Sequence, residues 1–179
     1  MSKEIRVGIV GTQFMGRAHT NAYLDVAKFF QLPAPPVLRA ACDVNVADLE
    51  VFSGRFGWQT QETSWEKLVA RDDIDLIDIC TPNSTHMPIA VAAAKAGKHI
   101  LCEKPVAMNA GEAQKMFEAA ERANVRNMVG FNYRRVPALA LARQLIDEGK
   151  IGRVHHFNAV YSQDWLAAPF LKEFKARPE

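Results

Sequence analysis

The stretch Val10-Gly11-Thr12-Gln13-Phe14-Met15-Gly16 follows a short apolar run and leads into a helical pattern. This is the context of a dinucleotide-binding fingerprint, in which a glycine turn joins a parallel strand to a helix. Gly11 permits the tight turn, and Gly16 permits close packing of the helix on the strand. The free N–H groups of Phe14, Met15 and Gly16 at the helix start predict an anion site.

Gln13 stands where the fingerprint has its middle glycine. That glycine normally lets the backbone approach a pyrophosphate, so we expect the Gln13 side chain to point aside, with the cofactor as a candidate contact. The imperfect turn alone is a weak signal, because single glycines often mark ordinary turns.

Apolar runs alternate with helical patterns along the next hundred residues. Strands are expected at Ile5–Val10, Val37–Cys42, Leu76–Cys80, His99–Cys102 and Asn127–Phe131. The first helix is expected to bury an apolar stripe made of Met15, Ala18, Ala22, Val26 and Phe29. Asn45, Thr63 and Asn109 are predicted to cap helices, and Gly97 to end one. The alternation predicts an α/β fold of the Rossmann type, a parallel sheet with helices on both faces.

Asp43 comes directly after the second expected strand. An acid there accepts hydrogen bonds from the adenosine ribose and repels a 2′-phosphate, which favours NAD over NADP. The interval from Gly11 exceeds the usual ~20 residues, and an insertion at Phe29–Pro36 accounts for the excess. The alternative is an aspartate that simply begins a helix.

The run Leu101-Cys102-Glu103-Lys104-Pro105 ends another expected strand. Ligands of open α/β sheets bind at the carboxyl ends of the strands, and partial burial there would bring the pKa of a lysine toward the range useful for proton transfer. The alternative is an ordinary Glu-Lys pair that closes a strand.

The pattern changes after Val136-Pro137. A helix is expected from Ala138 to Asp147, and then one long alternating strand, Arg153–Trp165. We therefore expect a nucleotide-binding domain at residues 1–136 and the start of an incomplete second, α+β domain for substrate binding and oligomerisation at residues 137–179.

Composition narrows the class of protein. The chain has 179 residues, 49% hydrophobic and 23% charged, with a net charge of +2 and no charge run. We expect no nucleic-acid partner, and no membrane partner because no apolar stretch approaches ~20 residues. Three unpaired cysteines and the absence of a leader predict a cytoplasmic protein.

These motifs together resemble the glucose-fructose oxidoreductase / inositol dehydrogenase / MocA (Gfo/Idh/MocA) family of sugar and polyol dehydrogenases. The resemblance is carried by the glycine turn with His19, by Cys42-Asp43, by Thr81-Pro82-Asn83-Ser84-Thr85-His86, by Ala96-Gly97-Lys98-His99, by Cys102-Glu103-Lys104-Pro105, by Gly130-Phe131-Asn132-Tyr133-Arg134 and by Gly149-Lys150-Ile151-Gly152. The Thr-Pro-Asn…His loop followed by Glu-Lys-Pro is the most specific part, and Gln13 is the departure.

The resemblance implies hydride transfer between NAD and a hydroxyl of a sugar, inositol or related polyol. Lys104 would be the catalytic residue, in a proton relay completed by an aspartate and a histidine of the second domain. The cofactor would also be contacted by residues beyond the turn, namely Thr81, Pro82, Asn83, His86, Glu103, Asn132 and Arg134. Local hydrogen bonding at a helix start is the alternative for His86.

Other candidate residues are given structural roles. His155 and His156 would point to opposite faces of a strand, so they cannot share an ion, and no metal site is predicted. His19 is expected to pack or to make a hydrogen bond on its helix.

Two other functions compete with the dehydrogenase. One is a non-enzymatic nucleotide-binding regulator of the same fold, against which the retained Lys104 argues. The other keeps the chemistry on a different substrate, such as an imine or a bilin. Relatives of this family are about twice as long, so the chain is expected to be truncated, to bind NAD weakly and not to turn over. The full-length protein is expected to form homo-oligomers.

Overall fold

A computed structural model describes residues 4–162 of the chain. The chain divides into two compact units, Met1–Gly130 and Phe131–Glu179. The boundary expected at residue 136 from the sequence stays a prediction.

The first unit is built on a six-stranded sheet with the strand order β3-β2-β1-β4-β5-β6. All its pairings are parallel, which confirms the α/β prediction. The strands are β1 (Ile5–Val10), β2 (Pro36–Cys42), β3 (Thr60–Glu62), β4 (Leu76–Ile79), β5 (His99–Cys102) and β6 (Asn127–Val129).

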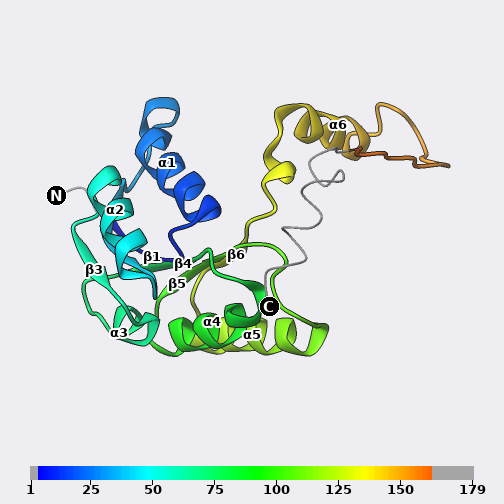
Figure 1. Cartoon of the computed structure of the whole chain (residues 1–179). Coiled ribbons are helices and arrows are strands. Elements are labelled where there is room, and N and C mark those ends of the chain that lie inside the picture. Colours follow the sequence, from blue (N-terminus) through cyan, green and yellow to red (C-terminus); the bar gives the residue numbers. More distant parts are fainter. Residues whose placement is uncertain (1–3, 163–179) are drawn as a thin grey trace. The chain divides into compact units, whose positions relative to one another are not determined.

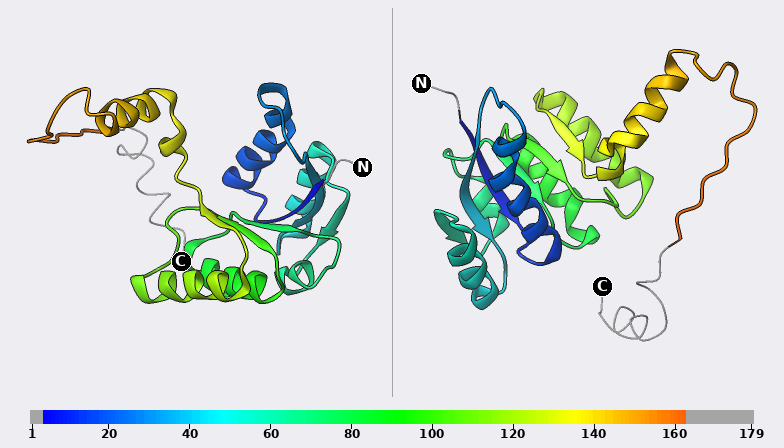
Figure 2. Two further views of the ribbon diagram at one scale, coloured as in Figure 1. Left: turned by 180° about the vertical axis from the view of Figure 1, so that it is seen from behind. Right: turned by 90° about the horizontal axis from the view of Figure 1, so that it is seen from above.

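Helices cover both faces of the sheet. α1 and α2 lie on one face and α3, α4 and α5 on the other (Figure 1), as the two further views also show (Figure 2). Their bounds are α1 (Phe14–Phe29), α2 (Val46–Phe56), α3 (Trp65–Val69), α4 (His86–Lys95) and α5 (Ala110–Ala123), with a short 3-10 turn, η1 (Asn83–Thr85).

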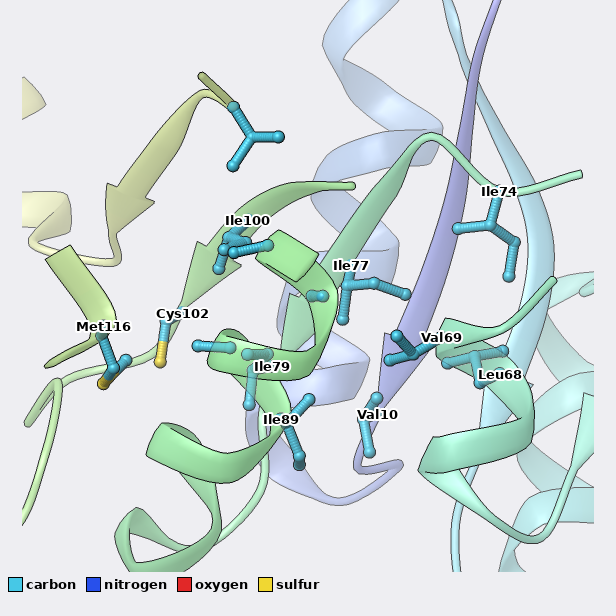
Figure 3. Close-up of a cluster of buried hydrophobic side chains, with 14 of the residues drawn as sticks. Val10, Leu68, Val69, Ile74, Ile77, Ile79, Ile89, Ile100, Cys102 and Met116 are labelled. Carbon is cyan, nitrogen blue, oxygen red and sulfur yellow. The ribbon is translucent and has the colours of Figure 1, made fainter. Parts of the chain in front are cut away.

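The larger hydrophobic cluster lies between the sheet and α3, α4 and α5. Ile77 and Ile79 of β4 are fully buried in it, together with Ile89 of α4 (Figure 3). Burial of one such side chain contributes about 1.5–3 kcal/mol. Central strands that are covered on both faces need apolar residues throughout, which explains their short apolar runs.

The inward face of α1 differs from the predicted stripe. Ala18, Ala22 and Phe29 are exposed, and Phe29 keeps 76% of its surface. The helix instead turns Thr20, which is buried, and His19, which is mostly buried, toward the sheet. The apolar-stripe prediction was therefore largely wrong, because the inward face of α1 contacts polar side chains of β4 and of the segment after β5.

Helix ends agree with the sequence at three of the four predicted positions. Asn45 accepts hydrogen bonds from two backbone N–H groups of α2, and Asn109 accepts one from Glu112. Gly97 follows α4 with a φ of 73°. The predicted cap Thr63 was wrong by one residue: Ser64 caps α3, since its hydroxyl accepts the N–H of Lys67.

The second unit contains the 3-10 turn η2 (Asn132–Arg135) and the helix α6 (Pro137–Asp147), which confirms the expected helix. The strand expected at Arg153–Trp165 was wrong over residues 153–162, which form none, and the rest of it lies outside the described residues. A strand needs a neighbour to pair with, and the described part of this unit offers none. No helix within residues 4–162 is both long and apolar enough to cross a bilayer.

Candidate functional site

The predicted site residues of the first unit gather at the carboxyl ends of the strands. Backbone hydrogen bonds continue past each strand and align the segments that follow: Gly11 N to Cys42 O (2.9 Å), Cys80 N to Val10 O (2.8 Å), Glu103 N to Ile79 O (2.9 Å) and Gly130 N to Cys102 O (2.8 Å). In open α/β sheets this edge is where ligands bind.

The turn after β1 requires its two glycines. Gly11 has a φ of 97°, and a Cβ there would lie 2.7 Å from the carbonyl oxygen of Cys80. A Cβ on Gly16 would overlap the carbonyl oxygen of Gly11. The turn and the first turn of α1 therefore pack backbone against backbone, as the sequence predicted.

The start of α1 is open to an anion. The helix has no side-chain cap and no acidic residue in its first turn. Its first N–H groups, at Phe14, Met15 and Gly16, have no intrahelical acceptor and carry the positive end of the helix dipole. Phe14 is 80% exposed beside them.

Gln13 points aside, as expected, but toward the protein. Its backbone is extended, with a φ of −76°, so the position does not need a glycine for its conformation. Its side-chain nitrogen donates to Asp48 Oδ2 at 2.8 Å, and Asn45 donates to the same oxygen at 2.9 Å. The side chain thereby links the glycine turn to the start of α2.

Asp43 holds the glycine turn through its carboxylate. Its Oδ2 accepts the backbone N–H of Thr12 at 2.9 Å and the Thr12 hydroxyl at 2.7 Å. Its Oδ1 accepts the N–H of Asn45 at 3.0 Å. A carboxylate has about four acceptor positions, so Asp43 keeps capacity for a further donor such as a ribose hydroxyl.

The segment Thr81–His86 is tied to the segment after β5 by a buried histidine. His86 is fully buried, with Nδ1 3.0 Å from the carbonyl oxygen of Pro105 and Nε2 2.9 Å from that of Thr81. A neutral ring donates through only one of these nitrogens at a time. Thr81 and Asn83 are half-buried and Pro82 is exposed, so these three residues rather than His86 are open to a ligand.

Glu103 and Lys104 have contrasting environments. Glu103 is 5% exposed, and its Oε2 accepts the backbone N–H of Lys104 at 3.2 Å. The Lys104 side chain is exposed in this chain, so the partial burial expected for it is not found. Its peptide bond to Pro105 is cis.

A buried polar network lies beneath this edge, and sequence reasoning missed it. His19 Nδ1 is 2.9 Å from Asp78 Oδ2, and His19 Nε2 is 3.2 Å from Glu103 Oε1. The Tyr23 hydroxyl donates to Asp78 Oδ2 at 2.9 Å, and the Cys80 thiol lies 3.6 Å from Asp78 Oδ1. The available signal was an acid within the apolar run of β4, together with His19 and Tyr23 four residues apart, on one helix face.

The network changes the acidity of its members. Burial by itself would lower the pKa of His19, but the hydrogen bond and charge of Asp78, helped by Glu103, outweigh it and raise that pKa above its usual value. Burial, reinforced by Asp78, raises the pKa of Tyr23 and of the Cys80 thiol well above their usual values. Both side chains therefore stay protonated and act as donors.

Several predicted residues lie elsewhere. Asn132 and Arg134 belong to η2 in the second unit and are exposed, so their contact with a cofactor stays a prediction. His155 and His156 are exposed in a segment without a strand, and the opposite-face argument about them no longer applies. Within residues 4–162, His19, Asp78 and Cys80 are the group of three metal-ligand types with their atoms within 4.8 Å of one another.

A parallel sheet with this glycine turn, an acid after β2 and an open helix start defines a dinucleotide-binding domain. Residues 5–131 match the family described as "Oxidoreductase family, NAD-binding Rossmann fold" (Gfo/Idh/MocA), and the chain belongs to this family.

One sequence comparison and two structural comparisons extend the match beyond the family domain. Levoglucosan dehydrogenase of Pseudarthrobacter phenanthrenivorans is 44% identical over 168 residues, which are 93% of this chain and 43% of the relative. The structure of levoglucosan dehydrogenase in complex with NADH superimposes with a TM-score of 0.82 at 43% identity, over 84% of this chain and 41% of that one. The structure of an oxidoreductase domain protein from Kribbella flavida superimposes with a TM-score of 0.89 at 48% identity. The match covers 93% of this chain and 45% of that one. The chain thus spans less than half the length of these relatives.

Proposed function

We propose that the protein carrying this chain is an NAD-dependent dehydrogenase that oxidises a hydroxyl group of a sugar or polyol. The observation that carries the proposal is the placement of Lys104 at the same strand edge as the glycine turn and Asp43. The match to levoglucosan dehydrogenase favours a sugar-like substrate over an imine or a bilin.

The residues at this edge fit the cofactor. The open start of α1 would hold the pyrophosphate, and the spare acceptor positions of Asp43 would take ribose hydroxyls and reject a 2′-phosphate. Thr81, Pro82 and Asn83 would line the nicotinamide side. When bound, NAD supplies the hydride acceptor.

The chemistry left to the chain is handling of a proton. Removal of a hydride from an alcohol carbon leaves a carbonyl, so the hydroxyl proton must also leave. Lys104, as a neutral amine beside the reacting hydroxyl, would accept its proton, and the ammonium so formed would stabilise the negative charge on that oxygen and then pass the proton to the next base of the relay. His86 would act on this site indirectly, since it links the backbones of Thr81 and Pro105.

The proposal includes a cytoplasmic location and a homo-oligomer. Cys42, Cys80 and Cys102 are free, which suits a reducing compartment. In the described part of the second unit, α6 leaves Leu139, Leu141 and Leu145 exposed. Exposed apolar residues favour a covering surface, which the rest of the full-length chain or a second copy of it would supply.

The test compares Lys104→Ala with Lys115→Ala in the full-length protein. Lys115 is an exposed lysine on α5 and serves as the matched control. With levoglucosan, inositol and NAD as reactants, we expect Lys104→Ala to lower kcat at least 10²-fold with NADH affinity kept, and Lys115→Ala to change neither.

Two outcomes would contradict the proposal. Full turnover by Lys104→Ala would remove the assigned role of this lysine. NADH binding by the wild-type protein without turnover of any sugar or polyol would favour the regulatory alternative. For the 179-residue chain by itself we expect NADH binding without turnover.

A further inference from the structure

His19 lies between two buried carboxylates that come from distant parts of the chain. Its Nδ1 faces Asp78 at 2.9 Å and its Nε2 faces Glu103 at 3.2 Å. The side chain of Asp78 is completely buried, that of Glu103 is 6% exposed, and that of His19 is 16% exposed. One imidazole therefore joins α1, β4 and the segment after β5.

Two buried carboxylates need a compensating cation. Within the described residues, the ion pairs of Asp78 and Glu103 are made with His19 alone. The other groups that face them are neutral donors: the Tyr23 hydroxyl and Cys80 thiol at Asp78, and the Lys104 N–H at Glu103. The Cys102 thiol donates to the Glu103 carbonyl at 3.5 Å. Only a doubly protonated His19 can donate to both carboxylates.

Glu103 connects His19 to the backbone of Lys104. Its Oε1 faces His19, and its Oε2 accepts the backbone N–H of Lys104. A Cβ on Gly130 would overlap Oε1, so the residue that follows β6 packs directly against the Glu103 carboxylate. The Glu103 carboxylate thus has one defined place, and the backbone of Lys104 is hydrogen-bonded to it.

We propose that His19, as an imidazolium, neutralises the Asp78–Glu103 pair and is a positioning residue for the segment that carries Lys104. The catalytic consequence rests on the proposed function, whereas the protonation state of His19 does not. His19 would touch neither cofactor nor substrate and would act through Glu103.

A metal ion is the competing explanation for the same cluster. The ligand-type atoms of His19, Asp78 and Cys80 lie close together, but zinc binds cysteine as the thiolate. Burial raises the pKa of Cys80, and Asp78 raises it further. A proton on His19 accounts for the direct contacts with both carboxylates, whereas an ion at Nδ1 would leave Glu103 unexplained.

The first experiment is an NMR titration of the histidine rings in the 179-residue chain. We expect His19 to carry protons on both nitrogens at neutral pH and to titrate above the ordinary histidine value of about 6.5. Glu103→Gln should lower the His19 pKa. A His19 that titrates at or below that ordinary value, or that does not respond to Glu103→Gln, would overturn the proposal.

Zinc provides a further arm of this experiment. Addition of Zn²⁺ to the metal-free chain should leave the His19 ring resonances unchanged. Stoichiometric binding that moves these resonances and is lost in Cys80→Ser would replace the proposal with a metal site.

The second experiment measures hydrogen exchange of the Lys104 amide in His19→Gln. Exchange should accelerate about tenfold at Lys104 while the core amides of Val7 and Ile9 exchange as in wild type. Lys28→Gln is the matched control, since it removes a cation of α1 from an exposed pair with Asp25. Uniform acceleration throughout the sheet, or none at Lys104, would contradict a positioning role. Failure of wild type to bind NADH would instead count against the proposed function alone.

Discussion

The carboxylate of Glu103 occupies the space that a side chain at residue 130 would need. A Cβ built on Gly130 would overlap Glu103 Oε1, and Gly130 donates its own N–H to the Cys102 carbonyl at 2.8 Å. The end of β6 and the segment after β5 therefore fit together only with a glycine at this position.

Gly130→Ala is consequently expected to displace Glu103 and weaken its contact with His19. We expect a loss of about 1–3 kcal/mol in the free energy of unfolding, measured by urea denaturation. Gly54→Ala is the control, because Gly54 lies within α2 with no atom near its Cβ position. Alanine at this position should raise the free energy of unfolding by about 0.5–1 kcal/mol. Equal effects of the two substitutions would contradict the described packing.

Asp43→Ala should affect both the cofactor and the glycine turn. Loss of the carboxylate removes the acceptor of the Thr12 N–H and hydroxyl, which should cost about 1–3 kcal/mol of stability. NADH affinity should fall about tenfold and the preference for NADH over NADPH should narrow. Fluorescence titration with both nucleotides measures this, with the exposed Asp72→Asn as the control. An unchanged preference would remove Asp43 from the recognition of the ribose.

The ion pair of Arg6 and Asp75 is expected to make the free energy of unfolding depend on pH in the acid range. A bidentate hydrogen bond from Arg6, which also donates its backbone N–H, lowers the pKa of Asp75 to about 2 from 3.8. The contribution of this ion pair to the free energy of unfolding is complete above pH 3.8 and is lost as the pH falls through about 2. The difference in stability between wild type and Asp75→Asn should shrink across this window. A difference that does not depend on pH would contradict the assignment.

The stabilising contribution of His19 is expected to depend on pH in the opposite sense, so that it is lost as the pH rises. The pKa of His19 is raised in the folded chain. Its contribution to the free energy of unfolding is therefore complete below the pKa of the unfolded chain, about 6.5. That contribution disappears as the pH rises through the pKa of the folded chain. The stability difference between wild type and His19→Gln should therefore be largest in mild acid. A difference that grows with alkaline pH would show that His19 is neutral in the fold.

The sequence was sufficient where local patterns and burial agree. Apolar runs identified the inner strands β1, β2, β4 and β5 because central strands are covered on both faces, and they also identified the edge strand β6. The glycine turn identified the strand edge where ligands bind. β3 escaped prediction because Thr60–Glu62 is short and polar. It joins the sheet only through pairing with β2.

The polar network was beyond sequence reasoning for a physical reason. The periodicity rule assigns the apolar face of a helix to the core, but α1 turns His19 and Tyr23 inward. That choice is favourable only because Asp78 and Glu103, far away in sequence, lie beneath the helix. The strand expected after residue 152 failed similarly, since alternation cannot supply a partner strand.

A titration of the 179-residue chain with NADH and NADPH, followed by nucleotide fluorescence, tests the central claim most directly. We predict saturable binding of NADH with a Kd below about 1 mM, weaker binding of NADPH, and loss of NADH binding in Gly16→Ala, whose Cβ would overlap the Gly11 carbonyl. A folded chain that binds neither nucleotide, or that binds both as tightly when Gly16 is replaced, would contradict the account.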